Sequence, residues 1–191
     1  MALSGLLPLL QRQQEYNKVL QRLSSSQSPS ILGLVGAEKA YLLASLLMEL
    51  SIPSSASCLV MTPTRADAER FGDDLLAFLP DLEERMRVFP SWEILPYDEA
   101  PPSVEVLGER LGILYDLLSG RGLLILASVS SVLQKVPAPG QLRTFQLVLE
   151  AGATMSREAI VAFLVEGGYE RVELVIARGQ FAVRGGIVDV F

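Results

Sequence analysis

Blocks of apolar residues with two different spacings follow one another along most of the chain. Short, continuous apolar blocks predict strands at residues 31–35, 58–61, 87–89 and 123–127. Apolar residues at helical spacing predict helices at residues 9–23, 38–49, 65–78 and 103–118. Thr64, with Asp67 three residues later, has the spacing of a helix cap. Because strands separated by such helices form crossover units, we expect an α/β fold whose parallel sheet has helices on both sides.

The pattern changes after the proline-rich stretch Pro137–Gly140. Beyond it we expect a smaller α+β domain, with a helix capped at Ser156 that stops at Gly167 and Gly168. Short strands are predicted at residues 144–149, 172–177, 181–184 and 187–191. The expected organisation is a helix and serine-rich linker, an α/β domain and the small domain, at residues 1–30, 31–136 and 137–191. Since the last predicted strand has no closing turn, we interpret the sequence as a fragment of a longer protein.

Composition excludes several kinds of chemistry. The 191 residues contain no histidine and one cysteine, which rules out a histidine triad, a histidine metal site and an internal disulfide, and is compatible with a reducing cytoplasm. The net charge of −6 argues against charge-driven binding to nucleic acid. No apolar stretch reaches the ~18 residues of a membrane span, and the amino terminus lacks the basic region of a signal peptide, so we expect no membrane.

A degenerate phosphate-loop pattern lies between the first predicted strand and the following helix. In the pattern G-x-x-x-x-G-K-[ST], Gly33 and Lys39 match, whereas Glu38 replaces the second glycine and Ala40 replaces the hydroxyl that binds magnesium. Gly36 lies within the loop but does not restore the motif. The strand at 123–127 ends in a serine rather than a carboxylate. An ordinary strand-to-helix turn and a decayed loop both predict no catalysis and no cofactor in this segment.

Arginines gather near the end of an otherwise acidic chain. Between Arg171 and Arg184 there are three arginines, including Arg178, and a single acid. If residues 178–180 form a hairpin turn, Arg171 and Arg184 share one exposed face of a sheet near Phe181. Such a face suits carboxylates on a partner protein. A solvated face whose charges prevent edge pairing is an equally good interpretation of the same residues.

Three segments resemble a known family. They are Trp92–Asp98, residues 127–131 and the tail at residues 178–191, which contains Arg-Gly-x-Phe-x-x-Arg-Gly. From about Ile31 onward the chain resembles the UvrB-like amino-terminal module of bacterial transcription-repair coupling factors. The excision-repair protein UvrB shares the tail but carries a longer, tyrosine-rich insertion for which this sequence has no room.

The resemblance implies a helicase-like first domain whose nucleotide site has decayed, and a second domain that docks onto UvrA. Arg171 and Arg184 match family positions that contact UvrA, whereas a further family arginine falls at Ala182. We therefore expect Arg171, Arg184 and Arg178 to bind UvrA, with Phe181 as a packing anchor. In the intact family, a separate motor uses ATP and magnesium, moves on double-stranded DNA and pushes on stalled RNA polymerase.

The sequence thus predicts a non-catalytic module that recruits UvrA. One alternative is a nucleotide-binding, helicase-like domain of the UvrB type. Another is a module that binds DNA directly.

Overall fold

The computed structural model describes residues 3–50, 55–92 and 103–191. Apart from Trp92, the segment Trp92–Asp98 lies outside these residues. The chain divides into two compact units, the first formed by residues 1–91 and 112–134 and the second by residues 92–111 and 135–191. Within the described residues, no helix combines the length and the apolar character needed to cross a bilayer.

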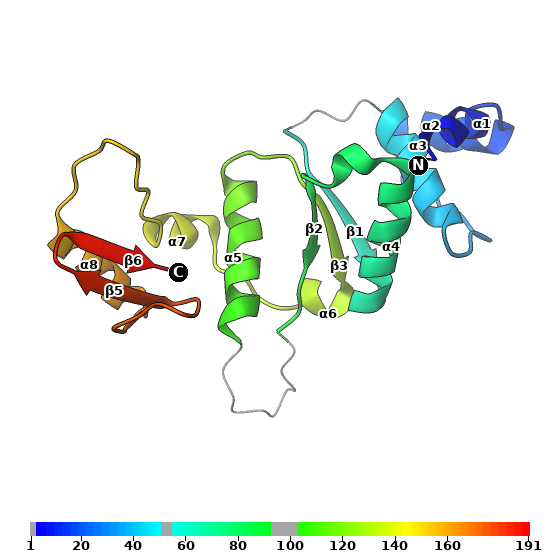
Figure 1. Ribbon diagram of the computed structural model, residues 1–191. Helices are drawn as coiled ribbons and strands as arrows, with labels where there is room; N and C mark the ends of the chain where they lie inside the picture. The colour runs from blue at the N-terminus through cyan, green and yellow to red at the C-terminus, as the bar shows by residue number, and fades with distance from the viewer. Residues whose placement is uncertain (1–2, 51–54, 93–102) are drawn as a thin grey trace. The chain divides into compact units, whose positions relative to one another are not determined.

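The first unit is a three-stranded sheet covered by helices (Figure 1). Its strands are β1 (Cys58–Thr62), β2 (Met86–Phe89) and β3 (Leu124–Ser128). Its helices are η1 (Ser4–Leu6), α1 (Leu7–Leu10), α2 (Gln14–Ser24), α3 (Glu38–Glu49), α4 (Arg65–Phe78), η2 (Pro80–Leu82) and α6 (Val129–Val132). The boundary between the units falls within α5 (Val104–Leu118).

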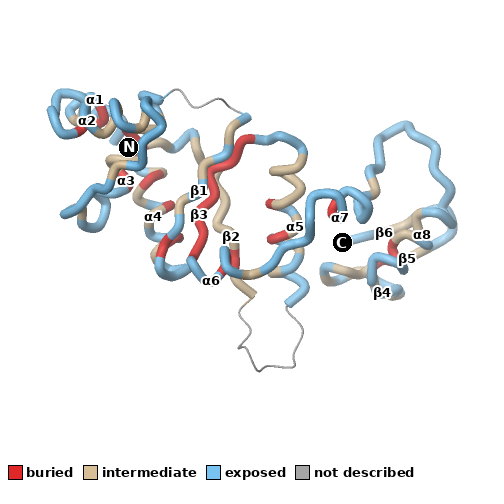
Figure 2. Tube along the Cα trace, turned by 180° about the vertical axis from the view of Figure 1, so that it is seen from behind, coloured by how far each residue is buried: buried red, intermediate tan, exposed pale blue. Residues whose placement is uncertain are grey.

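The strand order is β1-β3-β2, and both pairs are parallel. Leu124 of β3 faces Cys58 on one side and Met86 on the other. On one face of the sheet, Leu124 and Leu126 pack against α3 and α4 in the main core. On the other face, Ile125 and Ala127 pack against the part of α5 that belongs to this unit. Figure 2 shows β3 as the most continuously buried segment of the unit. The predicted α/β fold with a parallel sheet is confirmed.

Two helices of the first unit match the sequence prediction, and one of them has the expected cap. Helices α3 and α4 begin and end at the expected residues. The Thr64 hydroxyl accepts a hydrogen bond from the Asp67 backbone N–H, which satisfies one of the free donors at the start of α4.

Two predictions for the first unit were wrong. Residues 31–35 form a loop and not a strand, because Gly33 has a φ of +89° and no strand of the described sheet pairs with this segment. The single helix expected at residues 9–23 is divided into α1 and α2, since Gln13 adopts an extended conformation between them.

The second unit contains a small mixed sheet. Its helices are α7 (Pro139–Thr144) and α8 (Arg157–Glu166), and its strands are β4 (Glu170–Arg171), β5 (Gln180–Arg184) and β6 (Ile187–Val190). The Ser156 hydroxyl caps α8 by accepting from Ala159 N–H, as expected. The strand predicted at residues 144–149 was wrong, because α7 ends there and an irregular segment follows. The strand predicted at residues 172–177 was also wrong, since only Glu170 and Arg171 pair with β5.

Candidate functional site

The degenerate phosphate loop contains its own anion. Carboxylate oxygen Oε2 of Glu38 accepts a hydrogen bond of 2.9 Å from the Val35 backbone N–H. In a functional loop of this kind, backbone N–H groups bind phosphate oxygens. Gly33 and Gly36 have φ angles of +89° and +55°, so the loop still turns as glycine permits. The arrangement places a negative charge where a triphosphate would need to approach.

Ala40 cannot contribute to a metal site, because it is part of the core. Its exposed fraction is 0%, and it packs in the cluster that includes Ala44 and Leu75. Lys39, in contrast, is exposed. A hollow of about 320 Å³ beside the loop is lined by Leu6, Leu9, Ala37, Glu38, Tyr41 and Phe78. Since this lining has no basic side chain, it does not suit a triphosphate.

Arg171 and Arg184 of the second unit lie on opposite faces of its sheet. The expected hairpin at residues 178–180 was wrong, because β4 and β5 are parallel. Arg171 pairs with Phe181, and Arg184 lies three residues further along β5. Since side chains alternate between the faces of a strand, Arg171 and Arg184 leave from different faces. The short strand β4 pairs only with the start of β5, so the two arginines are also separated along the strand direction.

Arg184 is exposed and ion-paired. Its Nη2 lies 2.5 Å from Oδ2 of Asp189 on β6, and the two side chains are 62% and 38% exposed. An exposed pair of this kind contributes little to stability, because water solvates both charges well. The guanidinium therefore remains accessible to a carboxylate on another protein. Arg171 is exposed as well.

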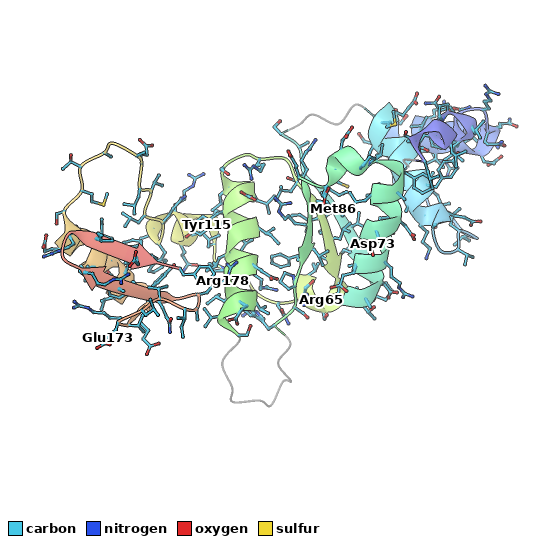
Figure 3. The ribbon with its side chains drawn as sticks, in the orientation of Figure 1. Arg65, Asp73, Met86, Tyr115, Glu173 and Arg178 are labelled. Carbon is cyan, nitrogen blue, oxygen red and sulfur yellow. The ribbon has the colours of Figure 1, made fainter. Side chains whose placement is uncertain are left out.

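Phe181 and Arg178 have different surroundings. Phe181 has an exposed fraction of 0%, so it packs inside the unit and does not contact a partner directly. Arg178 precedes β5, at the end of the strand opposite to Arg184, and its guanidinium carbon lies 5.5 Å from the centre of the Phe191 ring. Figure 3 labels Arg178 and also Glu173, which lies on the chain between β4 and β5. Arg171 faces Phe181, so along the chain of β5 Arg178 and Arg184 lie three residues to either side of the position that Arg171 faces.

A further arginine that the sequence did not single out is at the same end as Arg184. Nη1 of Arg157 donates a hydrogen bond of 2.8 Å to the Gly185 carbonyl oxygen in the β5–β6 turn. Nη2 of Arg157 lies 2.8 Å from Oε1 of Glu158. A backbone hydrogen bond to the Glu158 carboxyl, followed by the hydrogen bond from Arg157, lowers the pKa of this group. The contact with Gly185 joins residues 28 positions apart, so no local spacing indicates it.

The one tryptophan of the chain packs against a buried arginine. The guanidinium carbon of Arg110 lies 4.4 Å from the centre of the Trp92 ring. Arg110 is 1% exposed, and burial lowers the pKa of its guanidinium. This contact favours a structural role for Trp92, although the rest of the loop that it begins lies outside the described residues.

Comparison with known proteins adds a family to this geometry. Residues 147–191 match the family model of the UvrB interaction domain. The chain is similar to the transcription-repair-coupling factor of Mycobacterium bovis. The two are 33% identical over 197 aligned positions, which cover 99% of the present chain. The chain therefore belongs to the family of transcription-repair coupling factors, and the predicted resemblance is confirmed. The coupling factor of Escherichia coli is 28% identical over 78% of the chain.

The chain spans about a seventh of the length of these coupling factors, 15% of the Mycobacterium bovis protein and 13% of the Escherichia coli protein. It is also similar to UvrABC system protein B of Xylella fastidiosa, with 27% identity over 84% of the chain and 25% of that protein. The similarity thus extends to a UvrABC system protein B as well as to the coupling factors.

Proposed function

We propose that this chain is a non-catalytic module that recruits UvrA. Its place is within a larger transcription-repair coupling factor that works in the cytoplasm. The complete protein, by this proposal, is an ATP-dependent motor that moves on double-stranded DNA, displaces stalled RNA polymerase and brings excision repair to the lesion. The observation that supports the recruiting role best is the match of residues 147–191 to the UvrB interaction domain.

Exposed arginines of the small sheet supply the chemistry for this role. Arg171 and Arg184 both present guanidinium groups to solvent. A guanidinium forms two parallel hydrogen bonds with a carboxylate, which gives geometric specificity as well as affinity. A UvrA surface whose acidic residues reach both faces of the sheet is the complementary partner. Phe181 supports the strand from inside, and Arg178 is the least favoured of the proposed contacts because its guanidinium already lies over the Phe191 ring.

The test is a comparison of UvrA affinity between the wild type and Arg171→Ala/Arg184→Ala. Hydrogen bonds to charged groups contribute roughly 1.5–3 kcal/mol each, so the double variant is expected to bind UvrA at least about a hundredfold more weakly. Arg121→Ala is a matched control, because Arg121 is 60% exposed and also ion-paired, but lies in the first unit. Unchanged binding by the double variant would remove these residues from the site.

Two other functions make different predictions. A nucleotide-binding domain of the UvrB type requires measurable ATP affinity that is lost in Lys39→Ala; we expect no such affinity, since the Glu38 carboxylate already accepts a loop N–H. A direct DNA-binding module requires duplex affinity that falls steeply with salt. Because the net charge is −6, we expect neither affinity for duplex DNA nor a steep dependence of binding on salt.

A further inference from the structure

The hydrogen bond between Arg157 and the β5–β6 turn joins two segments that are far apart in sequence. Arg157 is the first residue of α8, and Gly185 follows Arg184 directly at the end of β5. The distance of 2.8 Å from Nη1 to the Gly185 carbonyl oxygen is that of a good charge-assisted bond. The bond therefore ties the start of α8 to the peptide unit that follows Arg184.

The two-residue turn between β5 and β6 consists of glycines, whose backbone conformation is weakly restrained. Gly185 and Gly186 connect Arg184 to Ile187, which face each other in the antiparallel pair. Gly185 has a φ of +58°, a conformation that glycine adopts readily, but glycine also has the greatest freedom to leave it. Both glycines are exposed, and a side chain added at either would meet no atom within 4 Å. Side-chain packing therefore does not restrain the two glycines. The strand pair of Arg184 with Ile187 closes the turn, and the bond from Arg157 holds the Gly185 peptide unit within it.

Two contacts thus define how Arg184 is presented. The Arg157 bond fixes the backbone after Arg184, and the Asp189 carboxylate orients its side chain from the neighbouring strand. Arg157 donates to two acceptors at once, the Gly185 carbonyl and the Glu158 carboxylate. This use of two donors in one plane requires a guanidinium, because the ammonium of lysine is a point charge without the planar fork.

We propose that Arg157 is a positioning residue of the partner-binding surface: it holds the β5–β6 turn so that Arg184 is preorganised for carboxylates on the partner. The proposal rests on the proposed function, because it assumes that Arg184 contacts UvrA. Preorganisation raises affinity by removing an ordering cost from the binding step. Arg157 acts through Arg184, not by a contact of its own with the partner.

The first test is a double-mutant cycle on UvrA affinity, using the full chain with Arg157→Gln, Arg184→Ala and both changes together. Arg157→Gln is expected to weaken binding about three- to tenfold when Arg184 is present, and less than about twofold in the Arg184→Ala background. Arg157→Lys should restore only part of the loss, since it keeps the charge but not the fork. Arg143→Gln, which changes another exposed arginine of the same unit, is the control and should bind like the wild type.

The second test needs no partner. Amide hydrogen exchange at residues 185–187 should be faster in Arg157→Gln than in the wild type and in Arg143→Gln, because the turn opens more often without the bond. Unchanged exchange would overturn the proposal. Equal losses of affinity in both backgrounds of the cycle would also overturn it, because they would indicate a direct contact. If Arg184→Ala binds UvrA like the wild type, Arg184 is not part of the UvrA-binding surface. The proposed role of Arg157 in binding is then overturned as well, even if hydrogen exchange shows that Arg157 holds the turn.

Discussion

At the scale of single residues, Ala40 occupies the motif position of the magnesium-binding hydroxyl but is part of the core. It has no exposed surface and packs near Ala44 and Leu75. Ala40→Thr should lower the free energy of unfolding by about 1–3 kcal/mol, because it adds atoms to a filled site and buries a hydroxyl. Urea denaturation measures the change.

Lys39→Ala is the matched control for this prediction, since Lys39 is exposed one residue away. Its effect should stay within about 0.5 kcal/mol. A stable Ala40→Thr variant that binds Mg-ATP would contradict both the stability prediction and the interpretation of the loop as decayed.

Tyr16 gives a prediction for alkaline pH. Its side chain is 3% exposed, and among the described residues its hydroxyl has no hydrogen-bond partner. Burial raises the pKa of Tyr16, and Glu49 and Tyr41 raise it further. Since the unfolded chain ionises this phenol first, the contribution to stability is complete below pH about 10 and is lost as pH rises through the higher folded pKa.

Tyr16→Phe should therefore lose less stability than the wild type between pH about 9 and about 11. At neutral pH it should be at least as stable, because it removes a buried hydroxyl without a partner. Urea denaturation at several pH values measures both effects. Parallel pH profiles for the two proteins would show that Tyr16 does not titrate differently on folding.

At the scale of elements, α4 packs tightly against the first sheet at Gly72. A Cβ at this position would lie 2.9 Å from Cδ1 of Leu126 and 3.2 Å from Cε of Met86. Because Leu126 is completely buried and cannot move away, Gly72→Ala should destabilise the unit by about 1–3 kcal/mol, in spite of the better helix propensity of alanine.

Gly112→Ala is the control in another helix. Gly112 lies in α5, is exposed and has no atom within 4 Å of an added Cβ. Here only helix propensity acts, and the change should stabilise by up to about 1 kcal/mol. Thermal unfolding of both variants distinguishes the two effects; equal shifts in Tm would mean that α4 has room to move away from the sheet.

The elements that the sequence predicted well are those with local signals. Helices α3, α4 and α8 follow from apolar spacing and, for the last two, from capping by Thr64 and Ser156. The strand expected at residues 31–35 depended on finding a neighbouring strand, which no local pattern specifies. Apolar character alone did not distinguish it from a loop.

The candidate site was predicted in composition but not in geometry. The sequence indicated Arg171 and Arg184, and the structure leaves both exposed on neighbouring strands of one sheet. The faces on which they lie depend on whether β4 and β5 are parallel, and this is decided by the path of the irregular segment between them. Arg157 was missed because its contact with Gly185 joins distant parts of the chain.

At the scale of the whole molecule, substitutions in the first unit should leave UvrA binding by the second unit unchanged. Lys39→Ala in the first unit is expected to leave UvrA affinity unchanged, whereas Arg184→Ala in the second should reduce it several-fold. Calorimetric titration of both variants with UvrA measures the difference. A loss of affinity in Lys39→Ala that equals the loss in Arg184→Ala would show that the loop contributes to the binding surface.

The bond from Val35 to Glu38 has a consequence for any attempt to reintroduce nucleotide binding. The carboxylate is attached to the same short segment as the amide that it occupies, so it competes as a tethered ligand. Short tethers correspond to effective concentrations in the millimolar range. A free nucleotide would thus have to displace the tethered Glu38 carboxylate from the Val35 amide. Introducing a hydroxyl at position 40 alone would leave this competing carboxylate in place.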